Sequence, residues 1–160
     1  QGLASGDKMD WIVEKAVELG ITRLVPIASQ RSVLQLSGPR LDKRLRHWRR
    51  IAQAASEQCG RNRIMPIEAP APLAQALPGI RADLTLLCHP GDGRRLDQCV
   101  PPATRDIVLL VGPEGGWSEP ELTCAHAHGS IPLVLGPRVL RTETAAIALT
   151  AAICAQLGWY

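Results

Sequence analysis

The chain has 160 residues, of which 46% are hydrophobic, and a formal net charge of +3. This length is enough for one compact domain with its own core and is short for two. The longest stretch of low charge, residues 144–157, is shorter than the roughly 20 residues that span a bilayer. We therefore expect a soluble protein. The chain starts at Gln1 and lacks a secretory signal, which is typical of a piece of a longer chain.

The five cysteines are odd in number, dispersed and without a C-x-x-C pair. This pattern argues against a disulfide framework and a zinc knuckle, and it favours the reducing cytoplasm. Cys124 and His128 would share one face of a helix, but two ligands do not complete a tetrahedral zinc site. We expect no metal.

The first third of the chain predicts two helices around one strand. Asp7 can cap a helix whose apolar residues recur every three or four positions, and Gly20 stands where that helix ends. Residues 22–28, "TRLVPIA", predict a strand, and Pro26 favours an edge position or a strand end. A second helix is expected over about 41–58, with an apolar stripe on one side and basic residues on the other.

The rest of the chain alternates strands and helices. Residues 83–89, 106–112 and 131–136 are short apolar runs typical of strands covered on both faces, and "LAQAL" is a short helical candidate. Ser118 and Glu121 form a capping-box pattern, and a final helix follows Arg141 with Thr142 or Thr144 as its cap. This alternation predicts an α/β fold with a mostly parallel sheet flanked by helices.

Ligands of such sheets bind where the loops converge beyond the carboxyl ends of the strands. Three loops qualify, at 88–93, 112–116 and 135–142. The loop "GPEGG" at 112–116 lacks the Gly-Lys-Ser/Thr ending of a phosphate loop, and Glu114, Glu119 and Glu121 would repel a phosphate. Its glycines and carboxylate suit an adenosyl sulfonium, which the backbone can approach closely. The alternative is a tight turn with glycines at positive φ.

The loop before the last helix carries Arg141 beside an apolar strand end. An arginine in that position needs an anionic or carbonyl partner, and a salt bridge to Glu114 or Glu143 would also satisfy it. Thr142 and Glu143 are ordinary residue types for the first turn of a helix.

Two segments, "LVGPEGGWSEPEL" and "LGPRVLRTETA", closely resemble the paired C-terminal motifs of the ribosomal RNA small-subunit methyltransferase E family (RsmE). "KAVELGITRLVPIASQRSV" and "AASEQCGRNRIMPI" are similar to its upstream motifs. The resemblance covers nearly the whole chain. It implies transfer of a methyl group from S-adenosylmethionine to N3 of a uridine in 16S ribosomal RNA.

The resemblance also implies the SPOUT fold over residues 1–160, with a C-terminal deep trefoil knot and a homodimer. Threaded chains are so rare that pattern reasoning alone would not suggest the knot. The family's N-terminal PUA-like RNA-binding barrel would be absent from this chain. Trp159 and Tyr160 are candidate contributors to the dimer interface.

The resemblance further implies roles for individual residues. The cofactor site would comprise Leu87, His89, Gly112, Pro113, Glu114, Gly115, Gly116, Leu135, Gly136, Val139 and Leu140. Arg31, Gln58 and Arg61 would face the RNA. Arg141 would hold a uracil carbonyl oxygen, and Glu143 or Glu114 would accept the N3 proton. Glu143 can equally be a structural cap.

Residues 40–63 contain eight basic and two acidic residues, an excess of +6. Arg40, Lys43, Arg44 and Arg50 on one helix face predict contacts with RNA phosphates, although a solvated charged face explains any one of them. Two other classes of protein are alternatives. A non-catalytic RNA- or nucleotide-binding module would leave the two loop motifs unexplained, and a nucleotide-hydrolysing enzyme would need a cation at the glycine loop.

Overall fold

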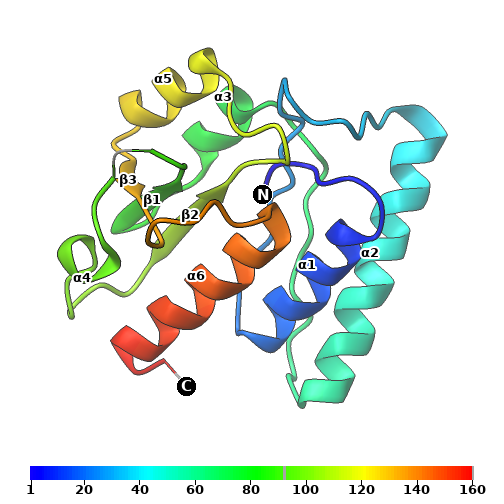
Figure 1. Ribbon diagram of the computed structural model, residues 1–160. Helices are drawn as coiled ribbons and strands as arrows, with labels where there is room; N and C mark the ends of the chain where they lie inside the picture. The colour runs from blue at the N-terminus through cyan, green and yellow to red at the C-terminus, as the bar shows by residue number, and fades with distance from the viewer. Residues whose placement is uncertain (92, 160) are drawn as a thin grey trace.

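The computed structural model describes residues 1–91 and 93–159 and confirms an α/β fold with a parallel sheet (Figure 1). The strands are β1 (Leu84–Cys88), β2 (Ile107–Val111) and β3 (Ile131–Leu133), in the order β2-β1-β3. The helices are α1 (Lys8–Glu18), α2 (Gly38–Cys59), α3 (Leu73–Ala76), α4 (Leu96–Cys99), α5 (Glu119–Ala127) and α6 (Thr142–Leu157), and a 3-10 turn, η1 (Leu77–Gly79), follows α3.

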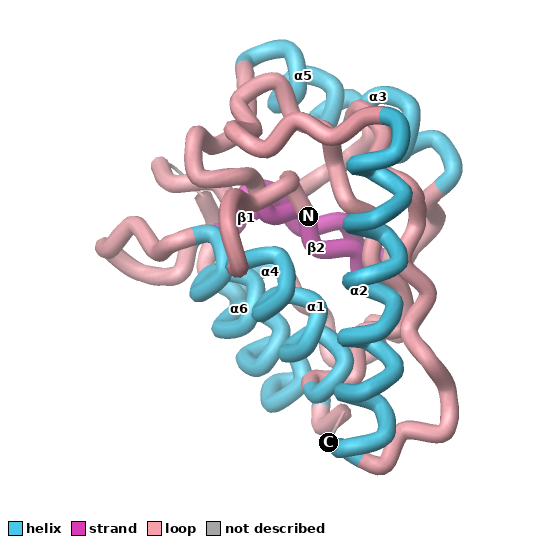
Figure 2. Tube along the Cα trace, turned by 90° about the vertical axis from the view of Figure 1, so that its right-hand side faces the viewer, coloured by secondary structure: helices cyan, strands magenta, loops and turns pink. Residues whose placement is uncertain are grey.

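Both faces of the sheet are covered, because successive strand residues point to opposite sides. On β1, Leu86 packs with Leu149 of α6, and the next residue, Leu87, packs with Leu73 of α3. Figure 2 shows α3 and α5 on one side of the sheet and α6, α1 and α2 side by side on the other. This double coverage explains why the strands are continuous apolar runs rather than alternating ones.

A separate apolar cluster joins the first two helices. Trp48 and Ala52 of α2 are fully buried against Met9 and Val13 of α1. The Trp48 ring nitrogen donates a hydrogen bond of 3.0 Å to the Asp10 carboxylate, so the largest side chain of this cluster has its polar group satisfied. The amphipathic pattern expected for α2 is therefore confirmed, although the helix begins at Gly38, three residues earlier than predicted.

The strand predicted at 22–28 is wrong in detail. This segment makes only isolated bridges, in which Leu24 pairs with Ile67 and Ile27 pairs with both Gly2 and Ala71. It lies between two segments rather than at an edge, and Pro26 has no N–H to continue a ladder. The amide of Gly2 in turn donates to the Val111 carbonyl over 2.7 Å, so these segments extend the sheet beyond β2.

Two predicted helix caps also differ from the structure. Asp7 occupies the position before α1 but its side chain makes no capping bond. Arg141 occupies the position before α6, and the Thr142 hydroxyl donates to the Gly112 carbonyl over 2.6 Å instead of capping the helix. By contrast, the capping box of Ser118 and Glu121 at the start of α5 is present as predicted.

The three strands end at the same level. Cys88, the last residue of β1, is in register with Val111 of β2 on one side and Leu133 of β3 on the other. Because the strands are parallel, the loops that follow them leave the sheet side by side. The sequence prediction that these loops converge at one edge is therefore confirmed.

Candidate functional site

A cavity of about 200 Å³ lies at the carboxyl ends of β1 and β3. Its walls are the loop at 88–91, the segment at 133–140 and Ala145 of α6. Five of the residues predicted to bind the cofactor line it: His89, Leu135, Gly136, Val139 and Leu140. Two loops that are more than 40 residues apart in the sequence thus form one site.

The walls of this cavity suit a ligand with both polar and apolar parts. His89 lines the cavity, and its Nδ1 atom is buried without a hydrogen-bond partner in the protein, which marks an unsatisfied polar group beside the cavity. Gly136 has a φ of +78°, and nothing lies within 4 Å of the position that a Cβ would take. The volume is below the roughly 300–1,000 Å³ of pockets for whole ligands, so it matches one part of such a ligand.

The glycine loop lies beside this cavity rather than in its wall. None of residues 112–116 lines it, and Leu87 belongs to the core behind it. The loop is tied to the start of α6 by the bond from Thr142 to the Gly112 carbonyl. A Cβ on Gly115 would lie 2.8 Å from the carbonyl oxygen of Arg31, whereas Gly116 has the positive φ of a turn, +69°. Both glycines have structural reasons to be glycine.

The carboxylate of Glu114 binds the N-terminal segment. It accepts hydrogen bonds from the amide (2.9 Å) and hydroxyl (2.6 Å) of Ser5 and from Nζ of Lys8 (2.7 Å). Partial desolvation raises the pKa of this carboxyl, but the bonds from Lys8 and Ser5 outweigh it and lower the pKa to about 2. Glu114 is therefore a poor proton acceptor.

The carboxylate of Glu121 is buried and serves two segments. Oε2 accepts bonds from the Ser118 amide (2.8 Å) and from the hydroxyls of Ser118 (2.8 Å) and Ser29 (3.0 Å). Oε1 accepts a bond from the Gln30 amide over 3.1 Å. Desolvation raises the pKa of Glu121, but these bonds reverse that effect, and the net pKa is below its usual value.

Arg141 and Glu143 stand at the start of α6, directly after the cavity wall. Arg141 is exposed, and the ion pairs of the described residues include none between Arg141 and Glu114 or Glu143. The Oε2 atom of Glu143 is buried and has no hydrogen-bond partner in the protein. The salt bridges considered as alternatives for Arg141 are thus not formed, and one buried oxygen of Glu143 has no partner within the described part of the protein.

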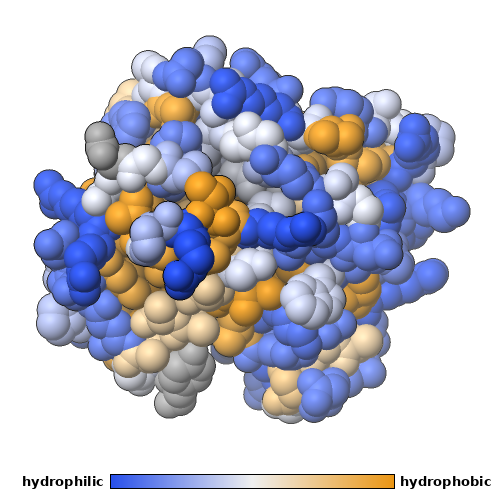
Figure 3. All heavy atoms as spheres, viewed as in Figure 1, coloured by the Kyte–Doolittle hydropathy of each residue, from blue (hydrophilic) through white to orange (hydrophobic). Residues whose placement is uncertain are grey.

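The basic residues predicted to bind RNA have different surroundings. Arg40, Lys43, Arg50 and Gln58 are exposed on α2, where Figure 3 shows a hydrophilic flank. Arg44 lies 3.8 Å from the Asp10 carboxylate. Arg61 donates to the carbonyls of Val17 (2.8 Å) and Ile21 (2.9 Å), so it clamps the end of α1. Arg31 reaches the glycine loop, where its guanidinium donates to the Gly115 carbonyl over 3.4 Å.

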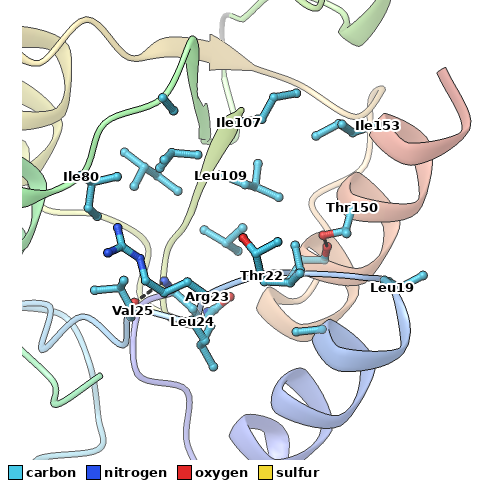
Figure 4. Close-up of a pocket in the computed structure, with 18 of the residues that line it drawn as sticks. Leu19, Thr22, Arg23, Leu24, Val25, Ile80, Ile107, Leu109, Thr150 and Ile153 are labelled. Atoms are coloured by element: carbon cyan, nitrogen blue, oxygen red, sulfur yellow. Dashed lines mark hydrogen bonds between the residues drawn. The ribbon is translucent and has the colours of Figure 1, made fainter. Parts of the chain in front are cut away.

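A larger cavity of about 410 Å³ lies elsewhere, between α1, α6 and β2. Figure 4 shows Ile107 and Leu109 of β2 facing Thr150 and Ile153 of α6 across it. None of the predicted site residues lines this cavity. Its walls are mostly aliphatic, whereas five of the predicted cofactor-binding residues line the smaller cavity. Arg141 and Glu143 line neither cavity. Size alone therefore does not identify the functional site.

Several contacts of the site carried no signal in the sequence. Ser5, Lys8, Ser29 and Gln30 lie far from Glu114 and Glu121 along the chain, and nothing in a single sequence pairs them with these carboxylates. Thr142 is a residue type that commonly caps helices, so its residue type did not predict the bond that its hydroxyl makes to the Gly112 carbonyl. Arg138 also lines the smaller cavity, although it was not among the predicted site residues.

Comparison with known families gives a direct match. The model of the RNA methyltransferase domain family matches residues 1–154. The chain belongs to the RNA methyltransferase domain family. The predicted resemblance is also confirmed, because a Bacillus subtilis protein named ribosomal RNA small subunit methyltransferase E is 32% identical over 97% of the chain.

Solved structures agree with this family membership. The crystal structure of ribosomal RNA small subunit methyltransferase E from Neisseria gonorrhoeae, bound to S-adenosylmethionine, is 36% identical, covers 97% of this chain and has a TM-score of 0.88. The SpoU methyltransferase AviRb from Streptomyces viridochromogenes is only 16% identical, covers 99% of this chain and 58% of its own, and has a TM-score of 0.58, so it supports the SPOUT-type fold alone.

This RNA methyltransferase domain spans only part of its relatives. The chain covers 64% of the Bacillus subtilis protein and 63% of the Neisseria gonorrhoeae structure. Among the described residues, no helix is both long and apolar enough to cross a membrane. Within the same residues, no group of three or more histidine, cysteine or acidic side chains is arranged to hold a metal ion.

The low pKa of Glu114 predicts a pH-dependent contribution to stability. A folded pKa of about 2, below the ordinary 4.5, means that the contribution is present above 4.5 and is lost as pH falls toward 2. We expect Glu114→Gln to lower the free energy of unfolding by about 1 kcal/mol at pH 7, and we expect this difference to shrink over that pH range. Urea unfolding at several pH values measures it.

Glu119→Gln is the matched control, because Glu119 is an exposed carboxylate in the first turn of α5. It should leave the stability nearly unchanged at all pH values. A Glu114→Gln protein as stable as the parent at pH 7 would show that the bonds to Ser5 and Lys8 contribute nothing.

Proposed function

We propose that this chain is the catalytic domain of an S-adenosylmethionine-dependent methyltransferase that modifies N3 of a uridine in 16S ribosomal RNA. The observation that carries the proposal is the cavity walled by the 88–91 and 133–140 segments, which five of the predicted cofactor-binding residues line. Arg141 and Glu143 follow the second of these segments in the chain. The names of the Bacillus subtilis and Neisseria gonorrhoeae relatives support the same activity. The chain's free cysteines fit the reducing cytoplasm, where such RNA is found.

The cavity would hold the adenosyl part of the cofactor. His89 would offer its unused Nδ1 to a polar edge of the ligand, and Leu135 and Leu140 would contact its apolar surface. Gly136 leaves room for the ligand to approach the backbone. When bound, S-adenosylmethionine supplies an electrophilic methyl group, so this domain needs neither a metal nor a covalent protein intermediate.

The protein's chemical task is to make the uridine nitrogen nucleophilic. The N3 atom attacks only after its proton leaves, and negative charge then spreads onto the neighbouring carbonyl oxygens. The exposed guanidinium of Arg141 would donate hydrogen bonds to one of these oxygens and stabilise the charge. Glu143, with an unpaired carboxylate oxygen, would accept the proton. Holding the uridine in line with the methyl group supplies the rest of the rate.

The exposed basic face of α2 would bind RNA phosphates outside the reaction site. Arg40, Lys43 and Arg50 have no ion-pair partner among the described residues and are free to contact a polyanion. With Arg31 beside the glycine loop, the α2 face would extend the contact area for a folded RNA. The N-terminal barrel that the resemblance implies would add to this surface in the full-length protein.

The last helix favours a homodimer. α6 carries one charged residue in 16 and is apolar on every side, which is typical of a helix covered all round. Figure 3 nevertheless shows hydrophobic atoms on the face over α6, where Ile147 and Ala148 are only half-buried. We infer that a second copy covers this face, which sedimentation at two concentrations would detect as twice the mass of the chain. We also propose that the chain forms the trefoil knot that the family resemblance implies.

Arg141→Ala should reduce methyl transfer strongly. Removing a donor that stabilises developing charge costs about 100-fold to 1,000-fold in kcat. The measurement is incorporation of labelled methyl groups into small-subunit RNA by the full-length protein. Arg95→Ala is the control, because Arg95 is an exposed arginine that lines neither cavity. Near-normal activity of the Arg141 variant would contradict the proposed mechanism.

Replacing Arg40, Lys43, Arg44 and Arg50 together by Gln should weaken RNA binding. The slope of log affinity against log salt should fall by about 3, since each lost phosphate contact removes somewhat less than one unit. Loss of S-adenosylmethionine affinity in the fourfold variant would show that the RNA-binding and cofactor-binding residues are wrongly assigned.

Arg61→Gln should instead lower the free energy of unfolding by about 1–3 kcal/mol, because it breaks the bonds to Val17 and Ile21.

A further inference from the structure

One buried carboxylate joins two segments that are 92 residues apart. The side chain of Glu121 closes the capping box at the start of α5 and also binds the Ser29 hydroxyl and the Gln30 amide. A capping box requires only the bond to the Ser118 amide. The two bonds to residues 29 and 30 are therefore additional, and they attach a loop to the helix start.

The attached loop carries Arg31 to the glycine loop. Arg31 follows Gln30 directly, and its backbone is so close to Gly115 that any side chain there would collide with it. Its guanidinium donates one hydrogen bond, to the Gly115 carbonyl, and the side chain is exposed. A guanidinium has five N–H donors in a fixed plane, so this single long contact leaves most of its donors free for an anion.

We propose that Glu121 is a positioning residue for RNA: it fixes the Ser29–Arg31 loop on the glycine loop so that Arg31 presents its free donors to a phosphate of the substrate. The inference rests on the proposed function, because it assigns a substrate contact to the same site. Without the carboxylate, the Ser29 hydroxyl and the Gln30 amide would lose their shared acceptor, and Arg31 would no longer be held in one direction.

Two serines allow a sharp test, because both donate to the same oxygen of Glu121 from different segments. Ser29→Ala removes a bond on the loop side, whereas Ser118→Ala removes one on the helix side. In the full-length protein, Ser29→Ala should raise KM for small-subunit RNA about threefold to tenfold, with kcat and the Kd for S-adenosylmethionine unchanged. Ser118→Ala should lower Tm without raising KM.

The double variant separates positioning from general stability. If Ser29 and Glu121 act through Arg31, Ser29→Ala should have no further effect on KM in an Arg31→Ala background. An equal rise in KM in both backgrounds would overturn the proposal, as would an unchanged KM in Arg31→Ala itself. A parent protein that does not methylate RNA would remove the proposed function, and this inference with it. Activity in the parent with no coupling between Ser29 and Arg31 would remove the inference alone.

Discussion

Two carboxylates near one glycine loop hold three distant segments together. Glu114 binds Ser5 and Lys8 before and within α1, and Glu121 binds Ser29 and Gln30. Each contact closes a stretch of more than 90 residues. The exposed Glu114 accepts three hydrogen bonds and the buried Glu121 accepts four, so the loop approaches the Arg31 backbone with both carboxylates satisfied. The position of the loop, and with it the start of α6, depends on these contacts.

The segments that follow the three strands have two different roles. The glycine loop supports the site from the end of β2 and anchors α6 through the bond from Thr142 to Gly112. The loop after β1 and the segment after β3 form the cavity itself. The carboxylates therefore bind parts of the protein, so they need not face a cationic ligand. An acidic loop can thus lie beside the proposed site for an RNA substrate.

The strands and helices could be predicted from the sequence because they depend on local patterns of apolar and capping residues. Three apolar runs gave the parallel strands, and the parallel direction placed their loops at one edge. The contacts that complete the site depend on pairing across the chain, which a single sequence does not encode visibly. Arg61 shows this limit: it stands in a basic segment, yet its guanidinium binds backbone carbonyls at the end of α1. Pro26 and Thr142 likewise have roles that only the folded neighbours define.

The central claim is that the cavity between residues 88–91 and 133–140 holds S-adenosylmethionine. Calorimetric titration of this chain tests it most directly, with ATP as the control ligand. Ala145→Met should fill the cavity from the buried wall of α6, and Ala54→Met, at an exposed position of α2, is its control. We expect saturable binding of S-adenosylmethionine that is absent with ATP, lost in Ala145→Met and retained in Ala54→Met. Binding that survives in a folded Ala145→Met protein, or no binding by the folded parent chain, would contradict the account.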